Sequence, residues 1–130
     1  MRRSIEERLA ALSTELRVDD EPSEMKLARG RHLVSHIEGQ LRDGVTHFDL
    51  MQQLHPTPAV GGYPHDQALA AIRTQEPFDR GWYAGPVGWM SKDAAEMAVA
   101  IRSGLVHDRH LALYSGAGIV EGSTPDGEWD

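Results

Sequence analysis

Residues 113–129, LYSGAGIVEGSTPDGEW, constrain the fold most, because a short apolar strand runs directly into a series of turns punctuated by glycine. The small residues at 115–118 let backbone N–H groups approach whatever lies above the end of the strand, which suits an anionic ligand better than an apolar ring. A β-bulge or an ordinary turn also needs glycine after a strand. This stretch alone therefore leaves both interpretations open.

The composition excludes several classes of protein. At 130 residues the chain is long enough for one domain with a core of its own. It contains no cysteine, which excludes disulfides and thiolate metal sites, and a cytoplasmic protein is expected. A net charge of -7 argues against a nucleic-acid partner. No stretch has the apolar length of a membrane span, so no membrane partner is expected either.

The first third of the sequence predicts a helix followed by strands. Ser4 and Glu7 have the spacing of a capping box, and apolar residues then recur at helical intervals. We therefore predict an amphipathic helix over residues 4–17. Two short strands are predicted at 25–27 and 31–38.

Two histidines fall on one face of the second predicted strand. His32 and His36 are four positions apart, an even separation, so in a strand their side chains point the same way. Such a pair can ligate a metal ion, but no third ligand is evident nearby. A histidine held by a hydrogen bond is the commoner arrangement.

The middle of the chain alternates between turns and helices. Residues 39–45 are predicted as a turn region, after which Thr46 caps a short helix over 46–54. Prolines and glycines then exclude a regular element from residues 55–64, which we predict to be a shaped loop. A second helix is predicted over residues 64–75.

The last third of the chain changes to the pattern of antiparallel strands. Alternation predicts strands at 82–90, 96–103 and 111–115, with a hairpin turn at 106–110. Tyr83 falls on one face of the first of these strands. Together with the helices, the pattern predicts an α+β fold in which an antiparallel sheet is flanked by helices.

One basic residue in these strands suits a binding site. Arg102 would lie beside Ala98 and Ala100, whose small side chains leave space for a guanidinium to meet a carboxylate in a fork geometry. An exposed arginine among small residues fits the pattern equally well. His107 and His110 are interpreted as surface residues of a turn.

Four separated segments occur in a characteristic order: LHPTPAVGG at 54–62, EPFDRGWYAGPVGW at 76–89, VAIRSG at 99–104 and LYSGAGIVEGSTPDGEW at 113–129. In order and approximate spacing they resemble the chorismate-utilising enzymes, and among these they most resemble the isochorismate synthases. The resemblance implies the two-sheet chorismate-binding fold. Residues 1–130 would form a C-terminal portion of it.

Within that portion the resemblance implies two parts. Residues 1–24 would be a helix and linker, and residues 25–130 would carry the motifs. It also implies that chorismate is the small-molecule partner and that Mg2+ is the cofactor. The parent protein would then be an isomerase that converts chorismate to isochorismate.

The resemblance implies roles for individual residues as well. Tyr83 and Arg102 would hold the enolpyruvyl carboxylate of chorismate, and the backbone at Ser115 and Gly116 would contact the same substrate. A substrate with two carboxylates needs a fork donor for one of them and a hard cation for the other, which is compatible with these roles.

Two further residues match the catalytic and metal positions of the family. His32 matches a catalytic histidine near the ring substituents, and Glu128 matches an acidic residue that helps to hold Mg2+. In the family reaction a lysine activates water, a glutamate protonates the leaving hydroxyl, and glutamates bind the magnesium.

The lysine, the acid glutamate and the first metal-binding glutamates of the family would fall upstream of residue 1, and the second acidic ligand just beyond Asp130. We therefore expect a C-terminal part clipped at both ends, inactive by itself and prone to self-association, from a parent that is a monomer or weak oligomer. A salicylate synthase or other chorismate-utilising enzyme, and a non-catalytic remnant that binds carboxylates, stay open as alternatives. The pathway served, menaquinone or siderophore supply, is also open.

Overall fold

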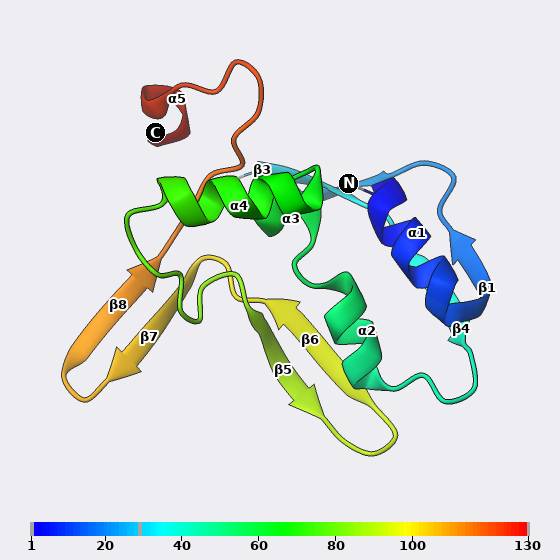
Figure 1. The fold of residues 1–130 in the computed structure, drawn as a ribbon. Helices are drawn as coiled ribbons and strands as arrows, with labels where there is room; N and C mark the ends of the chain where they lie inside the picture. Colours follow the sequence, from blue (N-terminus) through cyan, green and yellow to red (C-terminus); the bar gives the residue numbers. More distant parts are fainter. Residues whose placement is uncertain (1, 29, 130) are drawn as a thin grey trace. The chain divides into compact units, whose positions relative to one another are not determined.

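The computed structural model of the protein describes residues 2–28 and 30–129 (Figure 1). Its chain divides into two compact units, Met1–Leu54 and His55–Asp130. Each unit combines helices with antiparallel two-stranded ribbons. No helix in the described part of the chain is long and apolar enough to cross a bilayer.

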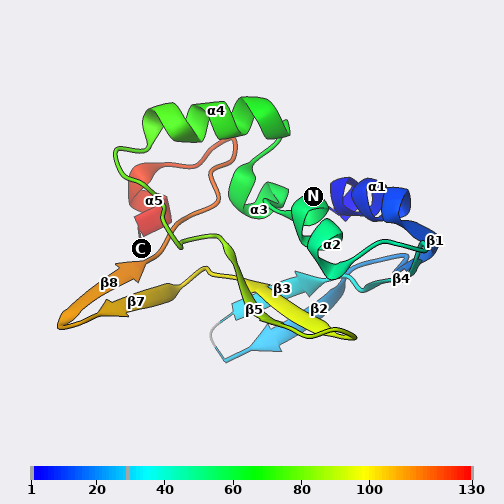
Figure 2. The ribbon, with the colours of Figure 1, turned by 60° about the horizontal axis from the view of Figure 1, so that its bottom comes forward.

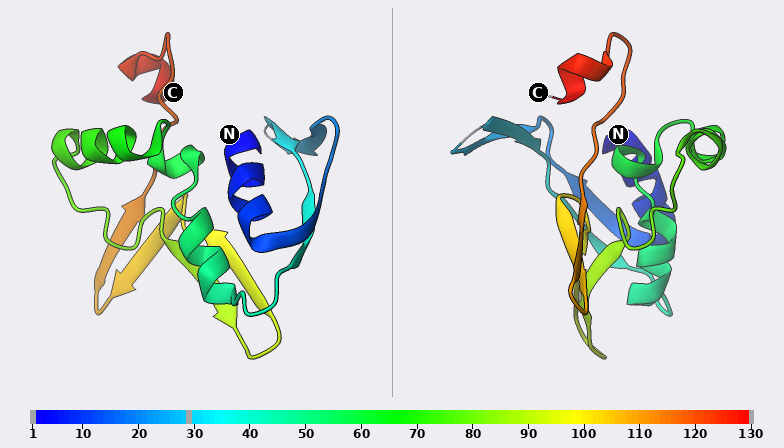
Figure 3. Two further views of the ribbon diagram at one scale, coloured as in Figure 1. Left: turned by 45° about the vertical axis from the view of Figure 1, so that its right-hand side comes forward. Right: turned by 90° about the vertical axis from the view of Figure 1, so that its left-hand side faces the viewer.

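The first unit joins two helices to two ribbons. Its elements are α1 (Arg2–Leu12), β1 (Ser13–Val18), β2 (Ser23–Leu27), β3 (Gly30–Val34), β4 (Ile37–Leu41) and α2 (His47–Leu54). Strand β1 pairs antiparallel with β4, and β2 pairs with β3 as a hairpin. Helix α1 packs against both β1 and α2, which Figure 3 shows as the blue helix beside the green one.

The predicted helix over 4–17 and the predicted turn over 39–45 are wrong in part. Helix α1 ends at Leu12, and the next six residues form β1. Residues 39–41, expected to turn, belong to its partner β4 (Ile37–Leu41). The apolar spacing of this segment fits both structures, because Leu16 and Val18 also alternate with exposed neighbours in a strand. Pairing with a distant segment decided the outcome, and local sequence does not reveal that pairing.

The single strand predicted over 31–38 is also broken. β3 ends at Val34 and β4 begins at Ile37. At the break, the Asp19 carboxylate accepts hydrogen bonds from the backbone N–H of His36, at 2.7 Å, and lies 3.1 Å from its Nδ1. These bonds to His36, the backbone one first, lower the pKa of Asp19.

The predicted cap of α2 is confirmed. The Thr46 hydroxyl accepts a hydrogen bond from the Asp49 N–H at 3.2 Å. The Asp49 carboxylate in turn accepts bonds from the Thr46 hydroxyl at 2.6 Å and the Thr46 N–H at 2.8 Å. This reciprocal pair satisfies backbone donors that the helix itself cannot. The bonds from Thr46, the side-chain one first, lower the pKa of Asp49.

The second unit carries the C-terminal motifs on three helices and two hairpins. Its elements are α3 (Pro58–Gly61), α4 (His65–Gln75), β5 (Pro86–Met90), β6 (Ala95–Val99), β7 (Ser103–His107), β8 (His110–Tyr114) and α5 (Pro125–Trp129). β5 pairs with β6, and β7 with β8. Figure 2 shows the hairpins as separate ribbons. The predicted helix over 64–75 is confirmed as α4.

Two local predictions for this unit are wrong. Pro58 does not exclude a helix, because it occupies the first position of the one-turn helix α3, where its missing N–H is not needed. The strands predicted over 82–90 and 96–103 are shorter than expected, since β5 begins at Pro86 and β6 ends at Val99. The backbone of Arg102 has a positive φ of 48°, which interrupts the extended conformation between β6 and β7.

The antiparallel α+β architecture is confirmed, but its apolar residues are largely uncovered. Among the described residues, the buried hydrophobic side chain is the small Ala84, which is 5% exposed. On the hairpins, Trp89, Val106, Leu111 and Leu113 are exposed. Because these side chains are exposed, the ribbons gain little support from packing within the described part of the chain. A two-stranded hairpin without such support is only marginally stable in water.

Candidate functional site

Two of the predicted site residues meet at a pair of stacked tyrosines. Tyr83 lies in the turn before β5, where its N–H donates a hydrogen bond to the Arg80 carbonyl at 2.8 Å. Its ring stacks on Tyr114, the last residue of β8, with centroids 5.8 Å apart and an interplanar angle of 15°. A Cβ added to Gly116 would collide with the Tyr83 hydroxyl. Gly116 thus leaves room for the tyrosine hydroxyl at this position.

Ser115 and Arg102 lie on the segments that adjoin this pair. Ser115 connects Tyr114 to Gly116 and is exposed. The backbone before Arg102 pairs with the segment after Tyr83, because the Ala84 N–H donates to the Ala100 carbonyl at 2.9 Å.

The predicted strand face for Arg102 is not present. Arg102 is exposed and follows the end of β6 rather than belonging to a strand. Its left-handed backbone sets the direction of the side chain, so the alternation with Ala98 and Ala100 that the sequence suggested does not hold.

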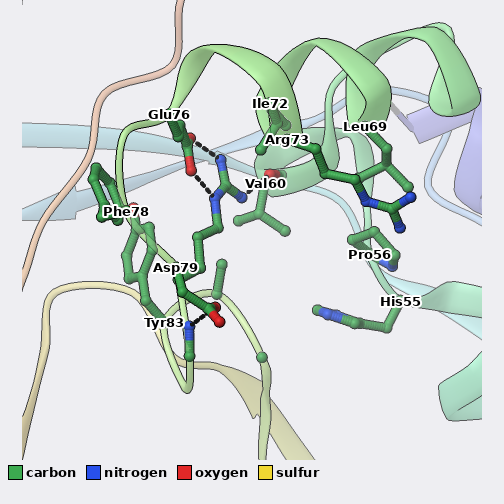
Figure 4. A pocket seen from close by; sticks show the side chains of 14 residues that line it. His55, Pro56, Val60, Leu69, Ile72, Arg73, Glu76, Phe78, Asp79 and Tyr83 are labelled. Atoms are coloured by element: carbon green, nitrogen blue, oxygen red, sulfur yellow. Dashed lines mark hydrogen bonds and ion pairs between the residues drawn. The ribbon is translucent and has the colours of Figure 1, made fainter.

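A cavity of about 490 Å³ lies beside Tyr83 (Figure 4). Residues of the loop that begins at His55, of α4 and its C-terminal end, and of 78–81 and 83–85 line the cavity, while Arg102, Ser115 and Gly116 do not. Burial lowers the pKa of His55. The imidazole is therefore neutral at pH 7 and offers the cavity a hydrogen-bonding group without charge.

An ion pair forms one wall of the cavity. The Arg80 Nε donates to Glu76 Oε2 at 2.7 Å, and Arg80 Nη2 donates to Glu76 Oε1 at 2.5 Å, as the dashed lines from Glu76 show in Figure 4. The hydrogen bonds from Arg80 lower the pKa of Glu76, and those to Glu76 raise the pKa of Arg80. Sequence analysis missed this pair. The spacing of four residues within EPFDR was the available indication.

The same guanidinium contacts two of the motifs. Arg80 Nη1 donates to the Val60 carbonyl at 2.7 Å, within the HPTPAVGG loop. The guanidinium carbon also lies 5.8 Å from the centroid of the Tyr83 ring. Residues from the loop, from EPFDRGWYAGPVGW and from the glycine-rich end of β8 therefore converge on Arg80 and Tyr83.

The predicted catalytic histidine belongs to the first unit. His32 is exposed on β3, paired across the hairpin with Met25. Its neighbour His36 bonds to Asp19, which is the hydrogen-bonded arrangement rather than a metal pair. His107 and His110 are exposed, as predicted, but they end β7 and begin β8, so they flank the turn instead of forming it.

The predicted metal ligand lies on the last helix. Glu128 is exposed in α5, and its Oε1 accepts a hydrogen bond from the Ser123 hydroxyl at 2.6 Å. Residues 2–28 and 30–129 contain no group of three or more histidine, cysteine, aspartate or glutamate side chains that could hold a metal ion. The described residues therefore do not fit a complete Mg2+ site by themselves.

Comparison with known proteins places this arrangement in a family. Residues 1–130 match the family described as "Chorismate binding enzyme". The chain belongs to this family of chorismate-binding enzymes.

Individual relatives are isochorismate synthases. The chain is 48% identical over 118 residues to the isochorismate synthase MenF of Bacillus subtilis. The aligned region covers 90% of this chain and 25% of that protein. A crystal structure of the putative 2,3-dihydroxybenzoate-specific isochorismate synthase DhbC of Bacillus anthracis superposes with a TM-score of 0.89 at 35% identity, covering 98% of this chain and 34% of that one. The menaquinone-specific isochorismate synthase MenF of Escherichia coli gives 0.87 at 38% identity, covering 98% and 29%. The chain thus spans about a third or less of the length of these relatives.

Proposed function

We propose that the protein containing this chain converts chorismate to isochorismate. The observation that carries the proposal is agreement in both sequence and structure along nearly the whole chain with enzymes named for that reaction. These relatives serve menaquinone in one case and 2,3-dihydroxybenzoate in another. The proposal is therefore made for the reaction and not for the pathway.

Within that function the chain supplies a surface for a substrate carboxylate. We assign Tyr83 and Arg102 to the enolpyruvyl carboxylate and the backbone at Ser115 and Gly116 to the adjoining part of the substrate. The contact between Tyr83 and Gly116 supports the grouping, and so does the backbone pairing that brings the Tyr83 segment to the one before Arg102. A guanidinium and a phenol together give charge-assisted and directional bonds to a carboxylate.

The assignments of His32 and Glu128 rest on the family resemblance. His32 would act near the ring of the substrate, and its exposure leaves the imidazole accessible. Glu128 would offer one oxygen ligand to Mg2+. The described residues hold no group of three such side chains that could bind a metal ion, so Glu128 would share the Mg2+ with water or with ligands outside this set.

The test is an assay of the complete gene product with chorismate and Mg2+. Isochorismate formation that stops when the metal is chelated supports the proposal. Release of pyruvate would instead indicate a salicylate synthase. Chorismate binding without any product would indicate a non-catalytic binding protein.

A variant pair tests the carboxylate site. Removing a hydrogen-bonding partner from a charged group typically costs 1.5–3 kcal/mol, so Arg102→Ala should lower kcat/KM by about tenfold to a hundredfold. Arg109→Ala is the matched control, because Arg109 is an exposed residue in the turn between β7 and β8. Equal kinetics for the two variants would remove Arg102 from the site.

A further inference from the structure

We propose that the Glu76–Arg80 ion pair is a positioning device that fixes the Tyr83 ring for substrate binding and ties it to the HPTPAVGG loop through the Val60 carbonyl. The proposal rests on the proposed function, since it gives Tyr83 a substrate to hold. Neither residue needs to touch the substrate. Both would act through Tyr83.

Geometry fixes the guanidinium at three points. Two of its N–H groups bond to the two Glu76 oxygens, and a third bonds to the Val60 carbonyl at 2.7 Å. The planar guanidinium thus donates through Nε and Nη2 to Glu76 and through Nη1 to Val60. A lysine ammonium on a flexible stem does not reproduce that geometry. The plane of Arg80 is therefore set by two separate chain segments, the end of α4 and the loop.

Partial burial strengthens this arrangement compared with a surface ion pair. The Arg80 and Glu76 side chains are 26% and 27% exposed. Helix α1 holds two more arginine–glutamate pairs with the same spacing of four residues. Arg2 with Glu6 is 39% and 29% exposed, whereas Arg3 with Glu7 is 89% and 65% exposed. Water screens the exposed pair, whereas it screens the Arg80 pair less.

Tyr83 needs external support because its own backbone is irregular. It lies in a turn rather than a strand, and the next residue, Ala84, has a left-handed φ of 61°. The ring stacks on Tyr114, and the guanidinium carbon of Arg80 lies 5.8 Å from its centroid. Its hydroxyl occupies the space that the absent side chain of Gly116 leaves. A cation near an aromatic face favours one ring placement, and a ring displaced by about 1 Å can cost a site much of its activity.

The first test measures ring placement without activity. The complete gene product is labelled with 3-fluorotyrosine, and Tyr83→Phe identifies the Tyr83 signal by its loss. We expect Arg80→Lys and Glu76→Gln to shift or broaden that 19F signal. Arg3→Lys and Glu7→Gln, which change the exposed pair, should leave it in place. An unchanged Tyr83 signal in both Arg80→Lys and Glu76→Gln overturns the proposal.

The second test asks whether the effect on turnover passes through Tyr83. We expect Arg80→Lys to lower kcat/KM at least tenfold, mainly through a higher KM, and to lower it by less than about twofold in a Tyr83→Phe background. An equal loss in both backgrounds refutes the positioning role, because a general folding defect would act regardless of the hydroxyl. If Arg80→Lys does not fold, the same cycle is measured with Glu76→Gln. If the wild-type protein does not convert chorismate, the proposed function fails and the 19F result alone decides on the ring placement.

Discussion

Gly116→Ala tests the contact that joins the glycine-rich stretch to Tyr83. A Cβ built on Gly116 collides with the Tyr83 hydroxyl and lies 3.3 Å from Cζ and 3.8 Å from Cε1 of the same ring. The ring must therefore move. Overpacking of this kind typically costs about 1–3 kcal/mol, which includes a stacked aromatic contact with Tyr114 worth about 0.5–1.5 kcal/mol. We expect Gly116→Ala to lower the free energy of unfolding by about 1–3 kcal/mol.

Two further variants isolate the cause. Gly118→Ala places the same methyl group where nothing lies within 4 Å, so its unfolding free energy should stay equal or rise slightly. Tyr83→Phe removes the oxygen that the new methyl group meets first. The nearest remaining atom is then at a distance that small shifts accommodate. Gly116→Ala should therefore cost less than half as much in the Tyr83→Phe background.

The assay is urea unfolding of the complete gene product, with variants compared at matched slopes. Equal losses for Gly116→Ala and Gly118→Ala would show that loss of glycine flexibility, and not the tyrosine, sets the cost. Additive effects of Gly116→Ala and Tyr83→Phe would likewise refute the contact, because residues that touch are expected to couple.

Three other substitutions test the local structure. Gly88→Ala places a methyl group against a backbone carbonyl of the paired strand and should destabilise the protein by about 1–3 kcal/mol in urea unfolding, whereas Gly104→Ala, whose nearest neighbours are at 3.2 Å and beyond, should cost clearly less. Thr46→Ala removes the cap of α2 and should cost about 0.5–2 kcal/mol in the same assay; no change would mean that the cap bonds are replaced by water. Burial lowers the pKa of His55, so the folded state resists its protonation; the associated stability is present above pH ~6.5 and is lost as the pH falls below that value. His55→Gln should flatten this dependence between about pH 5 and 7, while the same change at the exposed His107 should not; identical profiles for both variants would contradict the assignment.

Several parts of the fold could be predicted from the sequence because their determinants are local. The cap at Thr46 and the helix that became α4 depend on residues within a few positions of each other. The order of the four motifs also identified the family, which the match over residues 1–130 confirms. Such determinants are present in any short window of the chain.

The errors have two physical origins. Residues 13–18 have an apolar spacing that fits a helix or a strand, and pairing with β4, whose residues lie 19 to 28 positions further along, made them a strand. The expected face of Arg102 was lost for a local reason, because the left-handed backbone of Arg102 ended the alternation on which that expectation depended.

By itself the sequence determined the class of fold, the family, and the residue types available to hold a carboxylate. Only the tertiary structure decided that Gly116 makes room for Tyr83, and that Arg80 reaches the Val60 carbonyl. The reason is the range of the interactions. Capping, proline, alternation and the Glu76–Arg80 spacing act between near neighbours, whereas these two contacts join segments far apart in the sequence, whose meeting depends on how the chain pairs and turns.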